Sequence, residues 1–282
     1  MNCTICGYSS QPIMKILDIT LYRCKNCGHC FQDRLSEYNK MEYNEDYFEK
    51  EHPNWFNNPN IKLFEKVFDI ISNGINISKQ IDRPTIIDVG CGRGDLLRYL
   101  KKKNLNRVCS LLGLDLLENT SEEGITFIKG DIQETDIQEH YDYVINTATI
   151  EHIEDIHLFV DNLIRLCKPS SKIILMTINE NGYIYLLARI LYKMGIPFAA
   201  KRLYYGSKHI NHFSLRSLTY LLEMKGLKIN EIVHHNYPLS AVDLPPCSKT
   251  TAFFCKLGIL FLFITGSITK RASSVTVVCE IK

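Results

Sequence analysis

Residues 86–97 read IIDVGCGRGDLL, and this stretch decides the fold. A β-branched run is followed by glycine at every second position, Gly90, Gly92 and Gly94, and then by an amphipathic segment that begins at Asp95. Glycine allows positive φ and a close approach of the backbone to a ligand, and a helix start offers unpaired N–H groups. We therefore expect a strand, a ligand-binding turn and a helix. The alternative is a glycine turn that binds nothing.

From Thr85 onward, short apolar runs alternate with amphipathic segments, which is typical of a doubly wound α/β fold with a parallel sheet. Two long segments, 179–212 and 236–273, do not fit simple crossovers and are expected to be lids or binding loops. The expected strands are 85–90, 109–115, 125–129, 141–146, 172–178, 227–234 and 274–281, and the expected helices are 95–103, 155–167 and 215–225.

The charges around the glycine turn favour a cationic ligand. A dinucleotide fingerprint has glycine at its sixth position, where this chain has Asp95, and a carboxylate there would repel a pyrophosphate. Asp88 adds negative charge, which suits the ammonium and sulfonium of S-adenosylmethionine. Asp115 and Asp131 end the next two strands, where a ligand of such a sheet lies. They are placed to accept from ribose hydroxyls and from the adenine amino group.

Several motifs resemble the class I methyltransferase family across roughly residues 85–282: DVGCGRG at 88–94, GLD at 113–115, GD at 130–131 and TIEHI at 149–153. The resemblance implies a seven-stranded Rossmann-like sheet with the last strand antiparallel, and S-adenosylmethionine as cofactor. It also implies that Gly90 and Gly92 line the methionine part. The predicted cofactor-binding residues are Asp88, Gly90, Cys91, Gly92, Gly94, Asp115, Leu116, Asp131, Ile132, Asn146, Thr147 and Tyr47.

Two histidines are the candidate catalytic residues. Methyl transfer is an in-line displacement that needs alignment and exclusion of water, and an oxygen nucleophile also needs a base. His152 follows the fourth strand, with Glu151 beside it to orient it; the alternative is a histidine that packs under the adenosine. His212 precedes a helix capped by Ser214. It is the second candidate, although a polar loop would explain it as well.

Two C-x-x-C-G knuckles lie at the N-terminus, Cys3 with Cys6 and Cys24 with Cys27. Two such pairs complete a closed tetrahedral zinc site, which indicates structural zinc, not catalytic metal. His29 and Cys30 are adjacent and leave the ligand set open. The first residues lack a basic start and an apolar run, so we expect a cytoplasmic protein with reduced thiols.

The chain divides into a zinc-binding knot (1–35), a helical cover segment (36–83) and the methyltransferase domain (84–282) with its two inserts. Some bacterial small-molecule and sugar methyltransferases resemble this arrangement, which implies a hydroxyl of a sugar, glycan precursor or related metabolite as acceptor. A net charge of only +2 argues against extended nucleic-acid binding. Ribosomal RNA methylation and a catalytically silent binding module remain alternatives.

The apolar segment 251–264 suggests peripheral membrane contact. Its alternatives are a helix buried on the sheet and a homodimer interface.

Overall fold

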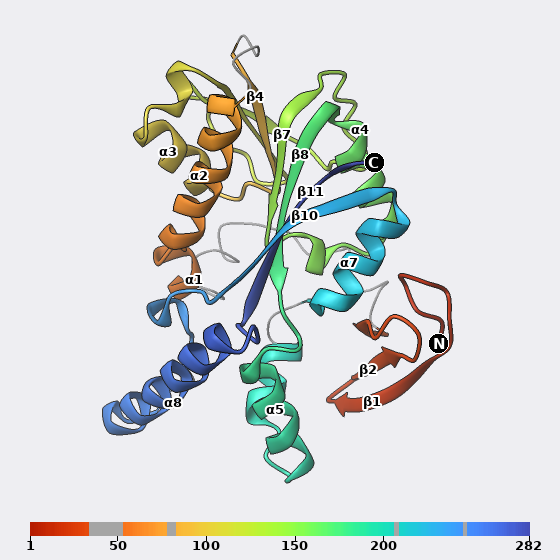
Figure 1. The fold of residues 1–282 in the computed structure, drawn as a ribbon. Coiled ribbons are helices and arrows are strands. Elements are labelled where there is room, and N and C mark those ends of the chain that lie inside the picture. Colours follow the sequence, from red (N-terminus) through yellow and green to blue (C-terminus); the bar gives the residue numbers. More distant parts are fainter. Residues whose placement is uncertain (34–52, 78–82, 206–208, 245–246) are drawn as a thin grey trace.

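A seven-stranded sheet forms the centre of the protein in a computed structural model that describes residues 1–33, 53–77, 83–205, 209–244 and 247–282 (Figure 1). β11 is antiparallel to both of its neighbours, and the other strands run parallel to one another, which confirms the predicted sheet. From edge to edge the strands are β10 (Leu227–His235), β11 (Ser274–Ile281), β8 (Cys167–Ile178), β7 (Tyr141–Thr147), β4 (Thr85–Val89), β5 (Ser110–Asp115) and β6 (Thr126–Lys129).

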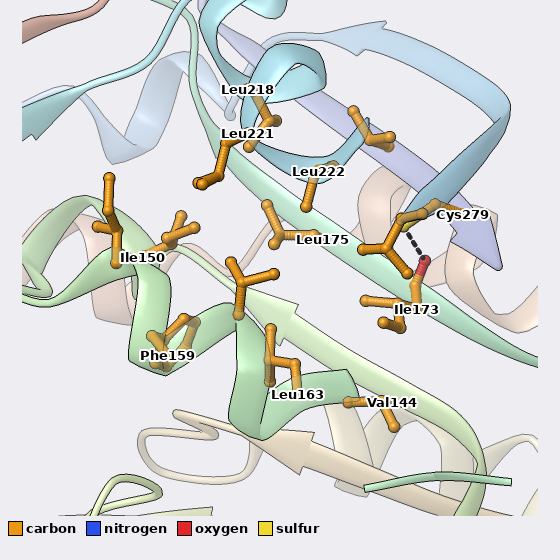
Figure 2. Close-up of a cluster of buried hydrophobic side chains, with 14 of the residues drawn as sticks. Val144, Ile150, Phe159, Leu163, Ile173, Leu175, Leu218, Leu221, Leu222 and Cys279 are labelled. Atoms are coloured by element: carbon orange, nitrogen blue, oxygen red, sulfur yellow. Dashed lines mark hydrogen bonds between the residues drawn. The ribbon is translucent and has the colours of Figure 1, made fainter. Parts of the chain in front are cut away.

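Helices cover both faces of the sheet. α2 (Ile61–Ile77) and α3 (Asp95–Lys102) lie on one face, and α4 (Ile156–Arg165) and α7 (Leu215–Met224) lie on the other (Figure 1). Successive strand residues point to opposite faces, so Val144 packs with α4 and α7 whereas Ile145 packs with α2 and α3. Figure 2 shows the first of these layers, in which Phe159, Leu163, Leu218, Leu221 and Leu222 meet Val144, Ile173 and Leu175.

β8 differs most from its predicted bounds, because it begins at Cys167, where 172 was expected. Ser170 takes a left-handed φ of 67° at the point where the family has glycines, and Cys167 still pairs with Tyr141. The strand therefore continues through a local irregularity that sequence pattern alone reads as a turn.

The N-terminal region forms a second, four-stranded antiparallel sheet from β1 (Ser10–Ile16), β2 (Ile19–Cys24), β3 (Cys30–Gln32) and β9 (Asn211–His212). β9 belongs to the insert 179–212, and its two residues pair with Cys30 and Phe31 of β3. The knot predicted as a separate unit therefore shares a sheet with an insert of the methyltransferase domain.

The two inserts extend beyond the carboxyl ends of the parallel strands (Figure 1). The first contains α5 (Tyr183–Lys193), α6 (Phe198–Ala200) and the π-helix η5 (Lys201–Tyr205). The second contains η6 (Leu239–Ala241), which contacts α1 (Pro53–Asn57), and the 20-residue α8 (Lys249–Ile268). By length and composition alone, α8 is apolar enough to cross a membrane. Two short 3-10 helices, η3 (Leu105–Arg107) and η4 (Ile150–His152), complete the described elements.

Candidate cofactor and catalytic site

A cavity of about 1230 Å³ lies at the carboxyl ends of β4, β5, β6 and β7, and residues of α1, α5, α8 and η6 line its outer part. A pocket for one drug-sized ligand measures roughly 300–1,000 Å³. This cavity therefore has room for a cofactor and a second molecule beside it.

The glycine turn forms the floor of the cavity and requires its glycines. Gly90, Gly92 and Gly94 have φ of 74°, 53° and 76°, values that residues with a side chain rarely adopt. A Cβ on Gly90 would lie 2.1 Å from Oγ1 of Thr149. The backbone N–H of Gly90 donates to the carbonyl of Leu114 at 2.8 Å, which fixes the turn against β5.

Asp115 is anchored beside this turn. One carboxylate oxygen accepts from the N–H of Gly92 at 2.7 Å, and the other accepts from the N–H of Leu117 at 2.8 Å. Burial raises the pKa of Asp115, and these backbone hydrogen bonds oppose that shift. A carboxylate oxygen can accept a second hydrogen bond, so the side chain can still receive ribose hydroxyls.

Asp88 is a buried carboxyl that suits a cation. Its side chain is 1% exposed, and its Oδ1 has no hydrogen-bond partner among the described residues. Burial, together with the negative charge of Asp115, raises the pKa of Asp88 to about 8. Two carboxylates in one cavity and an unpaired buried acceptor fit the ammonium and sulfonium groups of S-adenosylmethionine.

The affinity for S-adenosylhomocysteine is expected to rise with pH up to about 8. Asp88 is protonated below that pH in the free protein, whereas a bound ammonium favours the carboxylate, so binding releases a proton. The dissociation constant should therefore fall by up to roughly tenfold per pH unit between pH 6 and 8 and then level off. Isothermal titration calorimetry at several pH values measures this. Asp88→Asn should flatten the profile and Glu151→Gln should not; a profile that is flat in the wild type contradicts the idea.

Most predicted cofactor residues line the cavity. Gly94 and Asn146 do not: Gly94 lies against Phe127, and Asn146 is buried and donates to the carbonyl of Val89 at 2.7 Å. Both act on the shape of the turn. Tyr47 lies outside the described residues. The predicted residues in the wall are Asp88, Gly90, Cys91, Gly92, Asp115, Leu116, Asp131, Ile132 and Thr147.

Glu151, His152 and His209 form an acid–base cluster in the same cavity. Their ligand atoms lie within 4.8 Å of one another, and the imidazole centroids of His152 and His209 are 4.7 Å apart. Glu151 is 1% exposed and accepts from Oγ1 of Thr177 at 2.7 Å. Burial raises the pKa of Glu151 to about 7. The predicted His152 thus lies in the cavity, and Glu151 has the stronger signature of a base.

His212, the second predicted catalytic residue, does not line the cavity. It is fully buried outside the cavity wall, where it packs against Tyr204 at a centroid distance of 4.8 Å. Burial lowers the pKa of His212 to about 3. His209, three residues earlier in the same motif, lines the cavity in its place. The sequence pointed to the segment that contains both histidines, residues 207–214, but it did not show which of the two faces the cavity.

The four predicted cysteines converge at the N-terminus. Sγ of Cys3 lies 3.5 Å from Sγ of Cys27, and Sγ of Cys6 lies 3.4 Å from that of Cys24 and 3.6 Å from that of Cys27. Four thiolates at about 2.3 Å from one zinc ion would stand about 3.8 Å apart, so the donor set fits zinc.

His29 and Cys30, the two neighbouring candidates, lie apart from the four thiols. Cys30 belongs to a separate apolar cluster, and His29 contacts Oδ1 of Asn211. Neither residue lies in the cluster of four thiols.

Comparison with known proteins agrees with this geometry. Residues 60–232 match the model of a family described as "Methyltransferase domain", so the matched region includes α2, which was predicted to precede the domain. The ubiquinone biosynthesis O-methyltransferase of Rickettsia conorii is 27% identical over 166 residues, which cover 54% of this chain and 56% of that protein. The Rickettsia typhi protein of the same name is 26% identical over 70% of this chain and 86% of its own length.

One further relative is similar in sequence, and one solved structure is similar in fold. The malonyl-[acyl-carrier protein] O-methyltransferase of Calditerrivibrio nitroreducens is 27% identical over 43% of this chain and 47% of that protein. The crystal structure of the plantazolicin methyltransferase BpumL, in complex with a desmethylPZN analog and SAH, has a TM-score of 0.51 and 16% identity over 84% of this chain and 88% of its own. The family model covers more than half of the 282 residues, and together with the sheet order and the glycine turn it shows that this chain belongs to the class I S-adenosylmethionine-dependent methyltransferases.

Proposed function

We propose that the protein methylates a hydroxyl oxygen of a small-molecule acceptor. The observation that carries this proposal is the acid–base cluster of Glu151, His152 and His209 in the same cavity as the glycine turn. An oxygen nucleophile benefits from a base with a pKa near 7, and Glu151 has one. The relatives named above as O-methyltransferases support the same reaction.

Each part of the cavity has a role in this reaction. S-adenosylmethionine, when bound, supplies a methyl group activated by its positively charged sulfur. Asp88 and the glycine turn would hold its methionine part, Asp115 its ribose and Asp131 its adenine. Glu151 would take the proton from the acceptor hydroxyl, and His152 and His209 would orient that hydroxyl toward the methyl group. α1, η6 and α8 exclude water from the cavity.

The acceptor is polar at the point of reaction and apolar elsewhere. Glu151, His152 and His209 offer hydrogen bonds at the inner end, which fits the sugar or glycan-precursor hydroxyl expected from the sequence. The outer wall contains apolar side chains from α5 and α8, including Ile184 and Ile259. We therefore infer an acceptor that joins a hydroxyl-bearing ring to an apolar part.

The direct test has two steps. Saturating S-adenosylhomocysteine should raise the melting temperature by about 5–10 °C, because a ligand at a hundredfold its dissociation constant adds about 2.7 kcal/mol. S-adenosylmethionine should then be consumed with a panel of catechols, hydroquinones and glycosides, with and without alkyl chains, and the product should gain one methyl mass on oxygen. Stabilisation without turnover on any acceptor, and turnover on ribosomal RNA only, are the two results that would replace this proposal.

The cysteine cluster complements this proposal as a structural zinc site. Cys3, Cys24 and Cys27 are buried, and the four-thiolate set leaves no position for a substrate. We infer that zinc replaces the apolar core that so short a segment cannot build.

A further inference from the structure

A broad apolar surface lies on the two inserts. α5 and α8 contact each other and extend together past the carboxyl ends of the strands (Figure 1). Exposed apolar patches of this kind mark membrane or partner sites, because soluble monomers rarely expose them. The exposed side chains that make up this apolar surface are Leu187, Ile190, Met194, Ile196 and Phe198 from the first insert and Phe253, Phe254, Leu257, Leu260, Phe261, Ile264 and Ile268 from α8.

The charge of the same segments has one sign. Residues 181–205 and 247–273 together contain eight Lys and Arg and no Asp or Glu, although the whole chain has a net charge of only +2. Arg189 and Arg202 pair with Glu180 and Asp243. Lys193, Lys249 and Lys270 are exposed at the ends of α5 and α8. A cationic rim around an apolar face complements an anionic lipid surface.

The connections of α8 keep it on one side of a bilayer. The insert leaves the sheet at the end of β10 and returns at the start of β11, where His235 pairs with Ser274. Asn236 donates to the carbonyl of Phe263 at 2.9 Å and accepts from the N–H of Ser273 at 2.8 Å, so both ends of the insert are tied together. The preceding η6 packs on α1 of the domain. A helix in an insert whose two ends are tied together at the sheet fits a position along a bilayer surface.

The apolar surface is continuous with the cavity. Leu187, Phe198, Phe254 and Phe261 are 40%, 51%, 64% and 66% exposed, and the same four residues line the cavity. The apolar surface and the cavity that holds the acid–base cluster therefore share these four side chains.

We propose that this apolar surface docks on an anionic lipid bilayer and that the cavity receives its acceptor from that bilayer, as a hydroxyl-bearing headgroup with an alkyl or isoprenoid tail. The nature of the acceptor rests on the proposed methyl transfer, whereas the docking does not. The apolar area, the one-sided charge and the four side chains shared with the cavity all point to the same lipid phase.

Flotation with lipid vesicles tests the docking. Full-length protein, without cofactor or acceptor, is mixed with vesicles of phosphatidylcholine and phosphatidylglycerol, or of phosphatidylcholine alone. Wild type should float with the anionic vesicles, and less so at high salt. The double variant Phe253→Glu with Leu257→Glu replaces two exposed side chains that do not line the cavity, and it should lower the partition coefficient by at least about tenfold.

A matched variant, Leu158→Glu with Met224→Glu, places two charges at exposed apolar positions on α4 and α7, away from this surface, and should float like wild type. Melting with S-adenosylhomocysteine checks that every variant is folded. Docking is overturned if wild type binds neither kind of vesicle, or if the α8 variant binds as well as wild type. A wild-type dimer that dissociates in the α8 variant and ignores vesicles would also overturn it, by showing that a second copy covers this face. Because no methyl transfer is measured, a failure of the proposed reaction leaves this result unaffected.

Discussion

Replacing Glu151 by glutamine is expected to lower kcat by about 100- to 10,000-fold, the usual contribution of a positioned base. Glutamine keeps the size of the side chain and can still accept from Oγ1 of Thr177, but it cannot take a proton. Affinity for S-adenosylhomocysteine should be unchanged, because the glycine turn and Asp115 hold that ligand. Steady-state kinetics and calorimetry on the same preparation separate the two effects.

The pH profile provides an independent check on this assignment. Because burial raises the pKa of Glu151 to about 7, the carboxyl is protonated below that pH and becomes a base above it. With S-adenosylmethionine saturating at every pH, the wild-type kcat/KM for the acceptor should therefore rise with pH through about 7, and this rise should be absent from the variant. Glu180→Gln is the matched control, since Glu180 is equally buried but pairs with Arg23 outside the cavity. It should lower stability and keep the rise. Full turnover in the Glu151 variant would remove the base from the mechanism.

Loss of the N-terminal zinc is expected to lower the melting temperature by at least about 10 °C, because structural zinc contributes several kcal/mol of folding free energy. Cys27→Ser removes a fully buried ligand of the cluster. The core around it is shared with the catalytic domain, since Nε2 of His157 contacts the carbonyl of Ile5 at 2.9 Å. Melting with and without a zinc chelator, together with the zinc content per chain, measures the effect.

Turnover should fall along with stability. The side-chain amide of Gln32 in β3 donates to the backbone carbonyl of His209 at 2.6 Å. The backbone N–H of Gln32 donates to the backbone carbonyl of Ile210. The knot therefore positions a residue of the acid–base cluster. Cys109→Ser is the control, because Cys109 is buried outside the cluster: it should weaken the core and leave the zinc content at one per chain. A protein purified without zinc whose melting ignores the chelator would contradict the assignment.

The fold of the central sheet could be predicted, and the candidate cofactor residues could be placed at one edge of it, because both depend on local patterns. The turn at residues 90–94 needs positive φ, which only glycine adopts readily, so the sequence marks it directly. Asp88 and Asp115 end neighbouring strands, and parallel strands bring such ends to one edge. The two knuckles specify their own metal geometry in the same way.

The acceptor half was predicted less well, because long-range contacts determine it. His209 and His212 lie in the same short segment, and nothing in the sequence distinguishes them. His212 pairs with Cys30, which is far away in the chain, so His212 lies in the core and His209 lines the cavity. Glu151 was expected to orient His152 or to begin the next helix as a favourable N-terminal carboxylate, and its raised pKa comes from burial.

The sequence by itself determined the order of strands and helices, the glycine turn, the carboxylates at the strand ends and the four thiols. All of these depend on residue type and spacing, which act over a few positions of the chain. Only the tertiary structure decided that the zinc knot shares a sheet with the first insert, that Glu151 is the buried acid, and that α5 and α8 present one apolar surface. The reason is physical, because burial and strand pairing depend on which distant segments meet. The same glutamate or the same apolar helix can lie in water, in a core or at a membrane, and its own sequence does not distinguish these environments.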